Sequence, residues 1–196
     1  MIQDLDETLK QLLIQKVPID ANAIDIKFET PDKDWEAKPT KPTINCLLYD
    51  IRENHELRSN ERLLARNANN TKGIPSLAPV RIDVGYYITT WTTDVADEHR
   101  LLGNILKALL RHPTLPDDVL RGELMNPAQP IRAWIAQPEK TPNVWDIWGA
   151  VEGLMKAGLS YRVTIAVQSP ELDEVSLAQE LRTELVMMNS TSQQND

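Results

Sequence analysis

Alternating apolar and polar residues predict at least five strands in this chain. The stretches IDIKFE (24–29) and PVRIDVGYYITTW (79–91) alternate, while TINCLLYDI (43–51) is apolar on both faces and indicates a central strand. IRAWIAQ (131–137) and LSYRVTIAV (159–167) supply two more. In the longest of these strands, one face would carry Val80, Ile82, Val84, Tyr86 and Ile88, and the other Arg81, Asp83, Tyr87 and Thr89.

Two of the strands are joined by a polar stretch of mixed charge, residues 52–78. We expect this stretch to form a long β-hairpin whose arms extend past the core, with NANNTKG (67–73) at its tip. Residues 30–42 contain three prolines and several charges, so they predict a loop.

Helical spacing predicts the remaining elements. A first helix over residues 4–16 carries a leucine stripe, with Asp4 as its cap and Pro18 ending it. A second helix is expected over 96–112, and a short one over 143–155. Residues 174–188 predict an amphipathic C-terminal helix whose stripe contains Val175, Ala178, Leu181, Leu185 and Met188, widened by Leu177 and Val186.

Strands and helices are interspersed without a regular βαβ alternation. This order predicts an α+β fold: a single mixed, mostly antiparallel sheet with a long β-hairpin and flanking helices. The compositional break at QSPELDE (168–174) divides the chain into a core domain, 1–168, and a C-terminal amphipathic helix on a short hinge, 169–188. The polar tail 189–196 is expected to be disordered.

Composition narrows the functional classes. Of 196 residues, 41% are hydrophobic and 26% charged, enough apolar content for a packed domain. The net charge of −8 argues against a general nucleic-acid binder, although a local basic patch stays open. The lone Cys46 is expected to be a buried hydrophobe in a reducing compartment. Without a signal peptide or an apolar run of about 18 residues, we expect a soluble chain, made in the cytoplasm.

One acidic cluster beside a histidine could bind a metal or act as a general base. The acids also suit the start of helix 96–112, where they would cap free amides and complement the helix dipole. His99 and His112 are near opposite ends of this helix, unlike the one-face spacing of a two-histidine metal site. We therefore interpret as a helix cap the cluster of Asp94, Asp97, Glu98 and His99.

Other candidate sites are also explained structurally. The chain has no phosphate-binding or nucleophile-elbow glycine motif. The pair Asp117–Asp118 is expected in a solvated loop or helix start. Trp134, Trp145 and Trp148 are expected in a core or a subunit contact, the alternative being stacking on a base or sugar. We predict no catalytic, metal or cofactor site, and a structural or interaction protein rather than an enzyme.

Several segments together resemble a known family. LLYDIRENHELRSNE, PVRIDVGYYITTWTTDVADEHRLLGNILKALLRHPTLP, AQPEKTPNVWDIWGAV and LSYRVTIAV are similar to the cap, or tail-terminator, family of extracellular contractile injection systems, over about residues 2–167. These are phage-tail-like particles with a contractile sheath around a rigid tube. The resemblance implies a tail-terminator-like fold and a homohexameric ring at the baseplate-distal end, which terminates and links tube and sheath. Some members carry a further C-terminal domain, and little chain follows the core here.

The implied partners are further copies of the chain, the contractile sheath protein and the inner tube protein, with the tape-measure protein as a further candidate. Nucleic acid and direct membrane insertion are not expected. The particle would assemble in the cytoplasm and be released by lysis or anchored to a membrane. An adaptor or baseplate component of the same kind of particle is the alternative, and a small hydrolase or ligand-binding domain a remote one.

A ring requires contacts between subunits. Arginines with interleaved glutamates in the hairpin suit charge-matched docking, with a solvated loop as the alternative. The C-terminal helix could pack on its own domain or reach a sister or sheath subunit. The candidate interface residues are Arg52, His55, Arg58, Arg62, Arg66, Arg100, Lys107, Arg111, Leu181 and Leu185.

Overall fold

The computed structural model divides the chain into two compact units, residues 1–58 with 80–167 and residues 59–79 with 168–196. Among the described residues, the first unit holds a five-stranded sheet and the helices α1 and α2, and the second holds a three-stranded sheet. For three segments, 62–66, 72–76 and 175–176, the backbone alone is described. The described residues are 1–20, 22–31, 35, 40–59, 62–66, 72–137, 148–149, 155–168 and 175–176.

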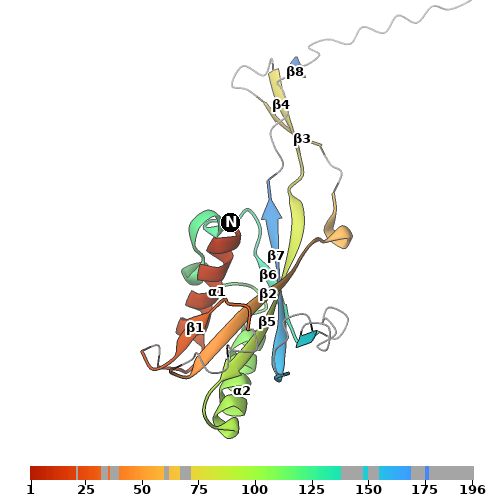
Figure 1. Cartoon of the computed structure of the whole chain (residues 1–196). Helices are drawn as coiled ribbons and strands as arrows, with labels where there is room; N and C mark the ends of the chain where they lie inside the picture. The colour runs from red at the N-terminus through yellow and green to blue at the C-terminus, as the bar shows by residue number, and fades with distance from the viewer. Residues whose placement is uncertain are drawn as a thin grey trace, which may run out of the picture. The chain divides into compact units, whose positions relative to one another are not determined.

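The five-stranded sheet is mixed and mostly antiparallel, as predicted (Figure 1). Its edge strand β1 is parallel to β2, and every other neighbouring pair is antiparallel. The longest predicted strand, β5, therefore lies in the middle of the sheet, paired with β2 and β7. In order across the sheet, the strands are β1 (Asp25–Lys27), β2 (Thr43–Glu53), β5 (Val80–Trp91), β7 (Gly158–Val167) and β6 (Arg132–Ile135).

Helices α1 (Ile2–Lys16) and α2 (Val95–Arg111) cover one face of this sheet (Figure 1). The leucine stripe of α1 is buried, as its spacing predicts. The predicted cap of α1 is wrong, because the helix begins at Ile2 and Asp4 lies in its first turn. The Asp4 carboxylate instead lies 2.8 Å from the N-terminal amine.

The helix-covered face contains the main core. Val84, Tyr86 and Ile88 alternate along β5 and are 0% exposed, which confirms that these three residues share one face of the strand. Cys46 is a free thiol, fully buried in the same core, and burial raises its pKa. The hydroxyl of Tyr86 donates to the carboxylate of Asp6 at 2.6 Å, which gives this buried phenol a partner on α1.

The opposite face of the sheet carries a smaller aromatic cluster. Trp35 and Trp91 meet edge to face at 4.5 Å between ring centroids. Trp148 packs edge to face against Trp91 and against Tyr87. Of the two predicted places, a core or a subunit contact, its burial supports the core. Trp134 is half-buried in β6, and Trp145 lies outside the described residues.

A β-bulge interrupts β2. Leu48 pairs with Tyr86 and Asp50 pairs with Gly85, so Tyr49 is an extra residue in this strand. A Cβ atom on Gly85 would lie 2.8 Å from the Tyr49 ring, so the bulged side chain lies over a strand position that has none. Beyond the bulge the residues of β2 exchange faces, and Asp50 turns away from the helices.

The second unit confirms the predicted hairpin. Strand β3 (Arg62–Arg66) is antiparallel to β4 (Lys72–Leu77), and Arg66 pairs with Gly73 at the end nearest the expected tip. A two-residue strand, β8 (Val175–Ser176), pairs with the other side of β4. These two residues therefore do not begin a helix as predicted. Residues 177–196, and most of the expected helix 143–155, lie outside the described residues.

Candidate functional site

The acidic cluster around His99 is a helix cap. The Asp94 carboxylate accepts hydrogen bonds from the backbone amides of Ala96 and Asp97, at 2.8 and 3.2 Å. His99 is exposed in the first turn, so the cluster does not converge on a common point. Among the described residues, no group of three or more His, Cys, Asp or Glu side chains is arranged to hold a metal ion. The cap interpretation is confirmed by these hydrogen bonds.

Glu98 has a second role that its sequence position did not reveal. Its carboxylate accepts a hydrogen bond from the Thr92 amide at 3.1 Å and pairs with the ammonium of Lys156. That ammonium lies 4.2 Å from the centroid of the Trp91 ring, within cation–π range. The start of α2 is thereby fixed to the segment preceding β7.

A buried polar network lies beyond the bulge on the sheet face opposite the helices. Arg162 of β7 is 5% exposed, and its guanidinium lies 3.4 Å from Asp50 and 3.7 Å from Asp83. Asp83 also accepts from the amide of Asn54, at 3.1 and 3.2 Å, and from the hydroxyl of Thr164. These contacts lock three neighbouring strands together. The sequence analysis missed the network, because it appears only once the register brings Asp83 and Arg162 to neighbouring positions.

Two predicted interface residues lie beside this network. Arg52 and His55 line a small hollow of about 270 Å³ together with Asp83 and Arg162. The side chain of Arg52 is exposed and donates to Asp50 at 2.6 Å, and this hydrogen bond holds the pKa of the guanidinium above its ordinary value. The hollow therefore presents acidic and basic groups side by side, suited to charged side chains of a partner.

The other hairpin arginines are distributed over both units. Arg58 is exposed and lies 3.3 Å from the carboxylate of Glu53, at the end of β2. Arg62 and Arg66 belong to β3, at backbone positions opposite Leu77 and Gly73. The structure thus gathers Arg52, His55 and Arg58 in the first unit. Arg62 and Arg66 belong to the second unit.

The three basic residues of α2 that we predicted as interface residues face the solvent. Arg100, Lys107 and Arg111 are exposed on the side away from the buried residues of the helix. Arg100 pairs with Asp97 one turn earlier. The register of β2 with β5 shows that Arg52 lies at the Asp83 end, whereas α2 begins just after Trp91, at the other end of β5. These two cationic groups therefore arise from opposite ends of the central strand. Leu181 and Leu185 lie outside the described residues.

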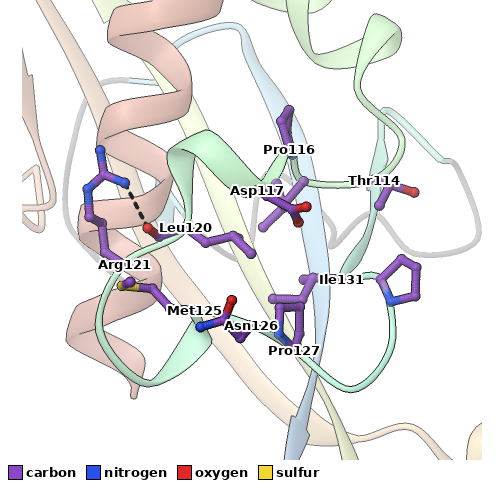
Figure 2. Close-up of a pocket in the computed structure, with 11 residues that line it drawn as sticks. Thr114, Pro116, Asp117, Leu120, Arg121, Met125, Asn126, Pro127 and Ile131 are labelled. Carbon is purple, nitrogen blue, oxygen red and sulfur yellow. Dashed lines mark hydrogen bonds between the residues drawn. The ribbon is translucent and has the colours of Figure 1, made fainter.

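A larger hollow, of about 860 Å³, opens between the two loops that precede and follow the 3₁₀ turns η3 (Asp117–Val119) and η4 (Gly122–Leu124) (Figure 2). Its floor is apolar, formed by Leu115, Leu120 and Ile131, each at most 5% exposed. The exposed Met125 and the carboxylate of Asp117 line its rim. Prolines without amide donors make up much of the wall: Pro116, Pro127 and Pro130.

The same loops explain the acidic pair singled out by sequence. Asp117 and Asp118 begin η3, as predicted for a helix start. Asp118 pairs with Lys16 of α1 at 2.5 Å, and this partner lowers the pKa of its carboxyl group. The guanidinium of Arg121 donates to the carbonyls of Asp118 and Leu120 at 3.0 and 2.7 Å (Figure 2). Lys16, Asp118 and Arg121 therefore each have a structural partner.

In the described part of the chain, no helix has both the length and the apolar content needed to cross a membrane. The candidate contact surfaces of the first unit are the hollow beside Arg52, the solvent side of α2 and the hollow above Leu120.

Comparison with known proteins identifies relatives of this fold. A family model described as the Pvc16 N-terminal domain matches residues 4–179. The sheath/tube terminator of PVC, an extracellular contractile injection system, has a TM-score of 0.69 with 21% identity, covering 98% of this chain and 65% of that chain. The tube-terminating cap of the anti-feeding prophage has a TM-score of 0.66 with 21% identity, covering 94% of this chain and 62% of that chain.

This chain therefore spans just under two thirds of the length of both structures. No curated protein matches it by sequence. The likeness confirms the predicted α+β fold of tail-terminator type.

Proposed function

Because this chain belongs to the family of the Pvc16 N-terminal domain, we propose that it is the cap of a contractile injection system. It forms a ring at the baseplate-distal end, where it stops growth of the inner tube and the contractile sheath and links the two. The observation that carries this proposal is the fold match over 98% of the chain to a sheath/tube terminator.

The role is structural rather than enzymatic. The two similar structures are a terminator and a cap, and the charged clusters of this chain have structural partners within the fold. Termination itself needs complementary surfaces, which require no reacting group.

The assembly we propose is a homohexamer, with the sheath protein and the inner tube protein as its main partners and the tape-measure protein as a further one. The charged groups of the first unit supply candidate contacts: Arg52, His55 and Arg58 at the end of β2, and Arg100, Lys107 and Arg111 on α2. The separate hairpin sheet, with Arg62 and Arg66, supplies a second surface, so one subunit can engage two kinds of partner.

Deletion of the gene tests this function. Particles purified without the protein should have irregular or excessive lengths, or sheaths that lose their distal end, when measured by electron microscopy. Supplying the parent chain should restore a single length. Supplying the Gln15→Ala chain is the matched control and should restore it too, because Gln15 is an exposed residue of α1 outside the proposed interfaces. Particles of normal length with intact distal ends in the deletion strain would refute the proposal.

A further inference from the structure

The solvent side of α2 carries an exposed apolar strip. Val95 is 64% exposed and Leu110 is 59% exposed, the two largest values among the exposed large hydrophobic residues of the described chain. Leu102 and Leu106 are half-buried between them. At 100° per residue these four side chains follow one flank of the helix, and the exposed His99 lies on the same flank between Val95 and Leu102. Gly103 lies beside them with no heavy atom within 4 Å of where its Cβ would be, so a partner can approach closely.

A cationic edge runs along this apolar strip. Arg100, Lys107 and Arg111 lie on its solvent side at spacings of seven and four. The helix dipole favours Arg111 in the last turn and Arg100 pairs with Asp97, but neither contact accounts for the cation at Lys107. On a chain with a net charge of −8, such an edge suits a partner that is apolar along one side and acidic beside it.

The chain itself contains a segment of this chemistry. Residues 177–188 carry Leu177, Leu181, Leu185 and Met188 at spacings of four, four and three, typical of a helix with one apolar side. Glu180 and Glu184 lie next to that side, four residues apart. The segment and the apolar strip are similar in length, 12 and 16 residues. Helix-in-groove recognition uses this spacing of apolar anchors.

We infer that residues 177–188 of a neighbouring copy dock on the apolar strip of α2, with Glu180 and Glu184 facing the cationic edge. This inference rests on the proposed function, because a ring requires a contact that links one copy to the next. It assigns a binding partner to a surface that the fold leaves uncovered, and it gives the C-terminal segment a role in assembly.

The charges also determine the direction of docking. Viewed along the helix axis, the cations follow the apolar strip of α2 in the direction of helix rotation. Glu180 and Glu184 precede the apolar side of the segment. Parallel packing brings these two edges together, as at the g and e positions of a parallel coiled coil. We therefore expect Met188 to lie near Leu110, at the C-terminal end of both helices.

Cysteine cross-linking between two chains tests both the contact and its direction. One chain carries Leu110→Cys and the other Met188→Cys, and they are mixed and oxidised as full-length proteins. The native Cys46 is fully buried, so background reaction is low. We expect a covalent dimer from this mixture and several-fold less from the matched control, in which Val95→Cys replaces Leu110→Cys.

The charge pairing has its own test in the same assay. Lys107→Glu should reduce the yield several-fold, and Glu184→Lys on the other chain should restore it, a rescue that a general loss of stability would not show. Dimers from the Val95 mixture instead would overturn the parallel direction.

Three outcomes would overturn the docking itself. They are no dimer from either mixture, a link only within one chain when both cysteines are on it, and binding of α2 to phosphatidylserine vesicles that Leu110→Asp abolishes. Ring mass and particle length are measured in parallel. Rings that cap particles without any cross-link would refute the docking and leave the proposed function standing. If the cross-link forms but particles keep their normal length when the gene is deleted, the proposed function is refuted and the docking stands.

Discussion

The Asp83→Leu variant should lose about 3–5 kcal/mol of unfolding free energy, because it removes one partner of a buried ion pair. Asp83 and Arg162 are each 5% exposed, so water cannot replace the lost carboxylate. Asp50, 3.4 Å from Arg162, retains part of the compensation. Against that, Asn54 and Thr164 lose an acceptor, at about 1–3 kcal/mol for each group left unsatisfied. The two corrections oppose each other, and the estimate stays in the same range.

Urea unfolding followed by tryptophan fluorescence measures this loss, because buried tryptophans pack on the same sheet face. Combining Asp83→Leu with Arg162→Met should recover about 2 kcal/mol or more, since the double variant leaves no uncompensated charge on this pair. The control is Arg52→Met, which breaks an exposed pair with Asp50 and should cost about 0–1 kcal/mol. Strictly additive single effects, or a loss below about 1 kcal/mol for Asp83→Leu, would refute the buried-pair argument.

Three further variants probe other parts of the first unit. Burial raises the pKa of Asp6 above 3.8, so the folded parent loses stability as the pH rises from 3.8 through this raised pKa. Asp6→Asn does not titrate and should therefore gain stability relative to the parent over this pH range. A pH-independent difference in urea unfolding would contradict this. Gly85→Ala should cost about 1–3 kcal/mol by displacing the bulged tyrosine, whereas Gly103→Ala should stabilise the free subunit by about 0.5–1 kcal/mol; equal thermal shifts would disprove the distinction. Asp94→Ala should cost about 0.5–2 kcal/mol and His99→Ala almost nothing, and bound stoichiometric metal in the parent protein would overturn the cap assignment.

Local periodicity was sufficient to predict the regular elements of the core. The alternation of β5 and the capped amphipathic pattern of α2 each depend on neighbours in sequence, and both are present with nearly the predicted bounds. The start of α1 was misplaced because Asp4 is a good cap by residue type. Its carboxylate pairs instead with the N-terminal amine and accepts from the amide of Glu123, which is distant in sequence.

Contacts between distant segments could not be predicted in the same way. Asp83 and Arg162 look like ordinary solvent-facing residues within their own strands, and only the β5–β7 register makes them neighbours. Likewise, nothing near Val175 signals a strand, because β8 exists by pairing with β4, about a hundred residues earlier. Of the proposed interface residues, the exposed cations of α2 could be selected from the sequence, whereas the apolar strip beside them required the burial of each helix position.

The extra residue at Tyr49 gives β2 one place where the strand can lose a residue without a change of pairing. If Tyr49 were deleted, Asp50, Ile51 and Arg52 could keep their partners Gly85, Val84 and Asp83 in a regular ladder, so each side chain would keep its face of the sheet. A single-codon deletion of Asn45 has no such outlet, because it would move Ile44 opposite Thr89 and out of the helix-covered core. We therefore expect the fold to survive the first deletion and not the second. Unfolding of the Tyr49 deletion would mean that the bulge itself, rather than the pairing on either side of it, is required for this arm of the sheet.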